Sequence, residues 1–212
     1  MGIVSSFVNN LTTNGVLTAD AINNASLNSI TSIPGGGDLK LISEATASSS
    51  ASIEFSLGSY KEYQFYFVNM HPQNNGIDFT FQTSIDNGSN YNVIITSTNF
   101  YAYHSEGDYT TLTYNTADDQ AQGTSFQPLI TDMGNANDES LTGSLQLFSP
   151  SSTTYVKHFI SRMQGYNGVN PGSADMYTAG YFNNGANNLT NIKFQMSSGN
   201  IDAGTIKMFA VV

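Results

Sequence analysis

Three histidines and several clusters of acidic residues are the side chains of this sequence best suited to catalysis or metal binding. His71 precedes a proline, His104 lies in Tyr-Ala-Tyr-His-Ser-Glu, and His158 lies within a run of β-branched and aromatic residues. None of them is spaced from another histidine or a carboxylate as zinc ligands are. We therefore expect each histidine to be a partly buried strand residue, and we predict no catalytic residue, no cofactor and no metal.

The densest group of oxygen-bearing side chains runs from Asp132 to Glu139. Carboxylate and amide oxygens bind Ca²⁺, but this segment lacks the alternating ligands, the central glycine and the final glutamate of an EF-hand. Its other interpretation is a polar connection between two strands, and the sequence leaves both open. A carboxylate pair for glycoside hydrolysis also stays open, because the separation of the two groups is a property of the fold.

Several signatures of enzymes are missing from the sequence. There is no cysteine, which excludes disulfides, thiolate catalysis and cysteine-bound zinc. There is also no Gly-x-Ser-x-Gly segment of a serine hydrolase and no glycine-rich nucleotide loop between a strand and a helix. We predict that the chain is not an enzyme, and a polysaccharide-degrading enzyme is the weakest of the alternatives.

Charge is scarce and mostly negative. Charged residues make up 10% of the sequence and the net charge is −10, whereas about 25% is typical of soluble domains. A nucleic acid or an anionic membrane surface would repel such a chain, and no apolar run approaches the ~20 residues of a membrane-spanning helix. The six Lys and Arg residues leave few to protect exposed strand edges, which favours an oligomer over a sandwich with short edges.

The amino terminus lacks the positively charged region of a secretory signal, since the first basic residue is Lys40. A chain without cysteine or signal fits synthesis in a bacterial cytoplasm followed by a role outside it.

The elements that must position any site are strands. From residue 39 onward, alternating or continuous apolar runs are separated by Gly, Asn, Asp and Ser, and no segment after residue 34 has a convincing helical pattern. This pattern predicts an all-β fold, a two-sheet antiparallel sandwich of the jelly-roll type. The expected strands are Leu39–Glu44, Ile53–Leu57, Tyr63–Met70, Phe79–Thr83, Tyr91–Thr98, Tyr109–Tyr114, Ser125–Ile130, Leu141–Phe148, Thr154–Met163, Tyr177–Phe182, Asn191–Met196 and Thr205–Val212.

Three local expectations accompany this assignment. Tyr63–Met70 is apolar on both faces, as an inner strand would be. The Asn87-Gly88 turn predicts that the two strands flanking it form a hairpin. The segment from Gln164 to Asp175 contains three glycines and a proline and is expected to be a loop.

The first 34 residues have a different pattern and form a predicted anchor and oligomerisation segment. Ile3, Phe7 and Leu11 share one helical face, and Leu17, Ile22 and Leu27 follow at a spacing of five. A segment this thin cannot bury these side chains alone, so we expect it to pack on other subunits or on a docking partner; the alternative is a mobile tail. A Gly-rich hinge at residues 35–38 then precedes a β-sandwich domain at residues 39–212.

An ordered series of motifs resembles a family of virion proteins of tailed bacteriophages, especially marine ones, over roughly residues 39 to 212. The motifs are Thr46–Ile53, Tyr60–Tyr63, Val68–Pro72, Asp78–Phe81, Asp86–Tyr91, Ser125–Leu129 and Ser197–Lys207. The resemblance implies a fibre, tail or decoration protein with an exposed sandwich, usually a homotrimer, and it transfers no catalytic residue. The chain departs from the family at Met208–Val212, where members often end in a Leu-Tyr-Gly-like sequence.

Two functions follow as hypotheses. In the first, the chain is a structural protein on the virion surface, a decoration protein or short fibre attached to the capsid, neck or tail by residues 1–34. In the second, it is a receptor-binding module of a tail fibre that binds a host-surface glycan. Tyrosines would then stack on sugar rings beside loops such as Gln164–Asp175. They are Tyr60, Tyr63, Tyr66, Tyr101, Tyr103, Tyr109, Tyr114, Tyr166, Tyr177 and Tyr181.

Overall fold

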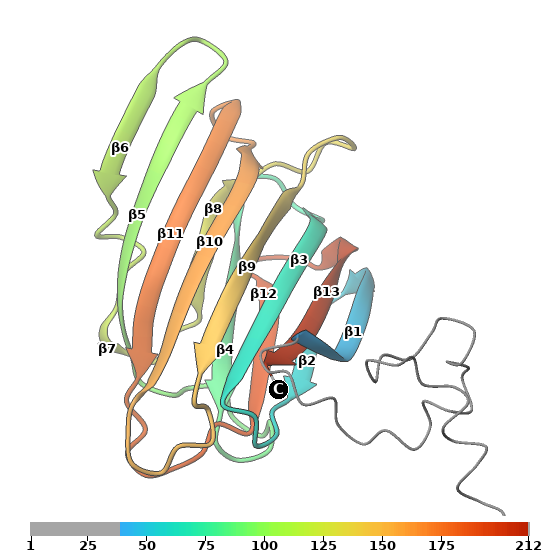
Figure 1. Ribbon diagram of the computed structural model, residues 1–212. Coiled ribbons are helices and arrows are strands. Elements are labelled where there is room, and N and C mark those ends of the chain that lie inside the picture. Colours follow the sequence, from blue (N-terminus) through green and yellow to red (C-terminus); the bar gives the residue numbers. More distant parts are fainter. Residues whose placement is uncertain (1–38, 212) are drawn as a thin grey trace, which may run out of the picture. The chain divides into compact units, whose positions relative to one another are not determined.

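The computed structural model describes residues 39–211, and they form thirteen antiparallel strands with no helix among them (Figure 1). This confirms the predicted all-β, two-sheet antiparallel sandwich. The strands are β1 Leu39–Ser50, β2 Ile53–Ser56, β3 Glu62–Pro72, β4 Ile77–Ser84, β5 Ile95–Ser105, β6 Thr110–Tyr114, β7 Ala121–Gly123, β8 Gln127–Met133, β9 Leu141–Phe148, β10 Lys157–Asn167, β11 Gly172–Phe182, β12 Asn191–Met196 and β13 Ile201–Val211.

The two layers differ in width. The large layer has the strand order β1-β13-β3-β9-β10-β11-β5-β6, with β7 beside the start of β5. The small layer, behind it in Figure 1, has the order β8-β4-β12-β2. The residue pair Asn167↔Met133 joins β10 of the large layer to β8 of the small one. Eight strands therefore lie over four, and part of the large layer has no strand of residues 39–211 opposite it.

The core between the layers is formed by every second side chain of the strands, because successive side chains of a strand point to opposite faces. On β3, Tyr63, Phe65 and Phe67 are buried between exposed or half-buried neighbours. Phe194 of β12 contacts a cluster of five other phenylalanines from both layers, with ring centroids 5.1 to 6.4 Å apart: Phe55, Phe65, Phe67, Phe79 and Phe81. Burial of large aromatic side chains is the main stabilising contribution in such a core.

Of the three local expectations, one was confirmed and two were wrong. β3 is an inner strand of its layer, between β13 and β9, although Tyr66 and Val68 on its outward face are exposed because nothing described covers that face. The predicted loop Gln164–Asp175 is mostly strand, since β10 and β11 pair in register from Lys157↔Phe182 to Asn167↔Gly172 and leave only residues 168–171 as a turn.

The hairpin expected across Asn87-Gly88 also does not form. The turn itself exists, with positive φ at both residues, and the Asp86 carboxylate accepts hydrogen bonds from Ser84 and Asn90. However, β8 and β12 occupy both edges of β4, so the chain leaves for the other layer, where β5 pairs with β11. Val93 of this connection packs on β4, because the buried Gln82 Nε2 lies 3.1 Å from its carbonyl oxygen; the carbonyl oxygens of Thr124 and Ser125, which precede β8, lie at the same distance from Gln82 Nε2.

Candidate functional site

A groove opens where the large layer extends past the edge of the small one. β8 is the edge strand of the small layer and lies against the first half of β5, where Ser97 Oγ donates to Gln127 Oε1. Beyond this contact, no described strand lies opposite the inward faces of β6 and of the second half of β5. The inward residues of β5 change accordingly, from buried Ile95 through Ser97 and Asn99 to half-buried Tyr101 and Tyr103. Because the large layer is wider than the small one, inward residues that would otherwise belong to the core form a polar and aromatic surface.

The large layer supplies one side of the groove. Strand register sets Tyr101 opposite Thr113 and Tyr103 opposite Thr111, so the two tyrosines of β5 and the two threonines of β6 share one face. Ala174 and Met176 of β11 lie beneath them. This side therefore offers aromatic ring faces beside hydroxyl groups.

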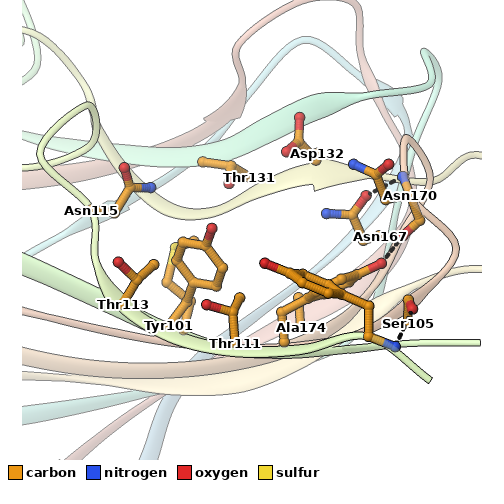
Figure 2. Close-up of a pocket in the computed structure, with 13 residues that line it drawn as sticks. Tyr101, Ser105, Thr111, Thr113, Asn115, Thr131, Asp132, Asn167, Asn170 and Ala174 are labelled. Atoms are coloured by element: carbon orange, nitrogen blue, oxygen red, sulfur yellow. Dashed lines mark hydrogen bonds between the residues drawn. The ribbon is translucent and has the colours of Figure 1, made fainter. Parts of the chain in front are cut away.

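The other side comes from β8 and from the β10–β11 turn. Thr131 and Asp132 project from β8, Asn167 is the last residue of β10, and Asn170 lies in the turn (Figure 2). Asp132 has a φ of 58°, a conformation that costs energy for a residue other than glycine and often occurs at functional sites. Its backbone is held on both sides: its N–H donates to Asp78 Oδ1 at 3.4 Å, and its carbonyl accepts from Gly168 N at 2.8 Å.

Hydrogen bonds fix the turn against the groove. The Asn167 side-chain oxygen accepts from the backbone N–H groups of Val169, at 3.0 Å, and Asn170, at 2.8 Å. The Tyr103 hydroxyl donates to the Asn170 carbonyl at 2.7 Å. The turn is therefore preorganised rather than free to close over a ligand.

The groove has a volume of about 540 Å³, within the range of small-molecule sites. Ser105 and Tyr109 line it near the β5–β6 turn, and Asn115 lines it beyond the end of β6. Among the residues drawn in Figure 2, Tyr101, Thr111, Thr131 and Asp132 make no hydrogen bond with one another. Their hydroxyl and carboxylate groups are available to a ligand.

The groove is electronegative. Asn115 donates to the carboxylate of Asp118, which lies behind the lining residues. Burial, followed by the negative charges of Asp78 and Asp132, raises the pKa of Asp118 to about 6. Three carboxylates thus lie close to one wall, and an anionic ligand would be repelled.

The structure brings together only part of what the sequence predicted as a sugar-binding surface. Tyr101, Tyr103 and Tyr109 meet in the groove beside the turn left from the predicted loop 164–175. Tyr63 is fully buried and its hydroxyl accepts from Gly58 N, while Tyr66, Tyr114, Tyr177 and Tyr181 lie on the outward face of the large layer.

Sequence reasoning did not single out Thr111, Thr113, Asn115 and Thr131, which also line the groove. It named Asp132 only as the start of the acidic segment, and it included Asn167 and Asn170 only within the predicted loop Gln164–Asp175. No spacing along the chain links segments this far apart.

The histidines do not meet. All three lie in strands, but His104 and His158 are exposed, which corrects the expectation of partial burial; His71 is half-buried, with Nε2 3.0 Å from the Ala136 carbonyl. The acidic segment 132–139 connects β8 to β9, and Glu139 accepts from Ala136 N at 2.8 Å. Within residues 39–211, no three His, Asp or Glu side chains are grouped closely enough to hold a metal ion.

The predicted anchor residues Ile3, Phe7, Leu11, Leu17, Ile22 and Leu27 lie outside the described residues, so their role stays a prediction. The described part of the chain also contains no helix long and apolar enough to cross a membrane.

Comparison of the chain with protein-family models, with curated proteins and with solved structures found no match. The functional argument therefore depends on the groove itself and on the sequence motifs.

Proposed function

We propose that this chain is a surface protein of a tailed-phage particle whose sandwich binds a neutral carbohydrate of the host surface in the groove. The observation that carries the binding role is the pair of facing sides: tyrosine rings and threonine hydroxyls on β5 and β6, opposite the Asp132 carboxylate and asparagine amides. Sugars present apolar C–H faces that stack on aromatic rings and hydroxyls that pair with carboxylates and amides, so both sides fit one ligand.

The electrostatics favour neutral over acidic sugars. Asp132 lines the groove, and Asp118 lies near it: burial, followed by the negative charges of Asp78 and Asp132, raises the pKa of Asp118. A sialylated or sulfated glycan would place its charge near these carboxylates, and its binding would weaken most at low ionic strength.

The groove favours binding over hydrolysis. Among the described residues that line it, Asp132 is the one with a carboxylate, whereas glycoside hydrolysis uses two carboxyl groups on either side of the scissile bond.

The virion location is supported by the sequence motifs, by the scarcity of charge and by the predicted two-part organisation. In this proposal residues 1–34 attach the protein to capsid, neck or tail and hold a homotrimer together, and the sandwich faces outward. Imaging of the particle would test it: hundreds of copies mean capsid decoration, and a few to a few dozen mean a neck or tail appendage. A chain never found in purified particles would contradict it.

Glycan binding is tested with the full-length chain on a glycan array, followed by calorimetry with the best ligand. Tyr101→Ala should weaken binding roughly tenfold, because it removes one stacked ring. The matched control is Tyr155→Ala, since Tyr155 lies in the β9–β10 connection and is 73% exposed. Equal affinity of the Tyr101→Ala variant and the unmodified chain would show that the groove is not the glycan site.

A further inference from the structure

A row of side chains crosses the outward face of the large layer. Strand register places Phe100 opposite both Tyr114 on β6 and Tyr177 on β11, and Tyr177 opposite Arg162 on β10. The rings of Phe100 and Tyr177 are parallel within 3°, with centroids 4.9 Å apart. The Arg162 guanidinium lies 5.0 Å from the centroid of the Tyr177 ring. Aromatic and arginine side chains arranged this way are typical of interface hot spots.

The row continues to the far edge of the layer. From Arg162 it passes through Ser144 on β9 and Tyr66 on β3 to Lys207 on β13 and Glu44 on β1. We define the neutral band as the outward residues of all eight strands that are in register with Thr98, Phe100 and Ala102 of β5. It comprises this row and one row on each side of it.

Charges within the neutral band cancel. Arg162 pairs with Asp175 through two hydrogen bonds of 3.0 and 2.7 Å. Lys207 lies 3.3 Å from Glu44. The band thus has no net charge on a chain whose net charge is −10. Elsewhere the surface of one copy repels another copy of the same chain, so like-charged copies approach most easily through this band.

The band is also apolar and wide. Of the thirteen large hydrophobic side chains exposed among residues 39–211, seven lie in it, including Leu112 at 74% and Ile160 at 51% exposure. Three rows across eight strands cover on the order of 700 Å² at ordinary strand spacing. That is close to the about 800 Å² per partner of a standard protein interface.

We propose that a second copy of this chain packs face to face on the neutral band. The contact is isologous, apolar residues meeting apolar residues across a two-fold axis. It does not depend on glycan binding, because the band and the groove lie on opposite faces of β5. It is also separate from the trimeric association expected of residues 1–34.

Sedimentation of the full-length chain over a range of concentrations tests this pairing. Ile160→Glu should raise the dissociation constant at least about tenfold, because it places a charge in an apolar contact. Val169→Glu is the matched control: it adds the same charge at a side chain that is 54% exposed in the β10–β11 turn. Added salt should strengthen the association of the unmodified chain by screening the repulsion between acidic copies.

A second measurement covers the case in which Ile160→Glu fails to fold. Because the chain has no cysteine, Ile160→Cys and Val169→Cys each introduce a single thiol. Maleimide should modify the Ile160→Cys thiol more slowly as protein concentration rises, and the Val169→Cys thiol at a constant rate.

Three outcomes would overturn the proposal. The first is that the chain stays monomeric at every concentration, and the second is that Leu17→Asp abolishes the association while Ile160→Glu leaves it intact. The third is that the chain is monomeric and loses glycan binding with Phe100→Ala. The last would assign the band to sugar rather than to a second copy.

Discussion

The Tyr103 hydroxyl on β5 donates a hydrogen bond of 2.7 Å to the main-chain carbonyl of Asn170 in the β10–β11 turn. This contact joins the aromatic side of the groove to its polar side. Because Asn170 also lines the groove, the geometry of the ligand site depends on a bond between two segments separated by 67 residues.

Tyr103→Phe should loosen the turn without unfolding the sandwich. The lost hydrogen bond contributes about 1 kcal/mol, so glycan affinity is expected to fall several-fold and the amides of residues 168–170 to exchange faster. Tyr155→Phe is the control, since the Tyr155 side chain does not line the groove and is 73% exposed. Unchanged exchange in the Tyr103→Phe variant would mean that the turn is held by its own Asn167 contacts.

Asp118 gives a pH dependence with a definite sign. Its pKa in the folded chain is about 6, compared with an ordinary value of 3.8. Between these values the folded chain binds the proton more tightly than the unfolded chain does, so this group adds stability as the pH falls through 6 towards 3.8.

Asp118→Asn should remove that dependence and stabilise the chain at pH 7 by on the order of 1 kcal/mol, after allowance for solvent screening.

Asp86 is the opposite case, because its hydrogen bonds with Ser84 and Asn90 lower its pKa to about 2. Asp86→Asn should therefore destabilise at pH 7, with an effect that disappears as the pH falls through 3.8 towards 2. Denaturant unfolding of both variants between pH 3 and 7 checks the two signs. If the free energy of unfolding of the Asp118→Asn variant changed with pH in the same way as that of the unmodified chain, the raised pKa of Asp118 beside Asp78 and Asp132 would be contradicted.

Phe194 is the centre of the core, where it contacts phenylalanines of both layers. Phe194→Ala should cost about 3–5 kcal/mol of unfolding free energy, because the cavity lies between close-packed rings. Phe100→Ala should cost far less, since that ring is 41% exposed. Chemical denaturation measures both, and equal losses would place the stabilising contacts outside this cluster.

The local sequence pattern predicted which segments form strands, but it did not predict where each strand ends or which strands pair. β11 begins at Gly172, five residues before its predicted start, because Ser173, Ala174 and Asp175 are held between β10 and β5 despite their weak preference for strands. The short strand β7 was not predicted, because its residues have little preference for strands and it is held in strand conformation by its pairing with β5.

The groove was even less predictable. Aromatic residues near the end of β5 indicated a binding surface, but Asp132, Asn115 and Asn170 reach it from segments that no sequence period connects. What forms the groove is the difference in width between the two layers, which is a consequence of strand pairing over long distances. Single-sequence patterns report on neighbours along the chain and not on such a difference.

The division between anchor and sandwich gives the last prediction. Residues 39–211 contain an extensive hydrophobic core, so deletion of residues 1–34 should leave a chain that unfolds cooperatively by circular dichroism. Ile3, Phe7, Leu11, Leu17, Ile22 and Leu27 each gain roughly 1.5–3 kcal/mol only when removed from water, and the truncated chain should therefore no longer join the virion. In the full-length chain, Leu17→Asp or Leu27→Asp should weaken incorporation by placing a charge on the shared apolar contact, whereas Asn28→Asp adds the same charge at a polar position and should not. If the truncated chain enters particles as well as the full-length chain does, the attachment surface lies on the sandwich.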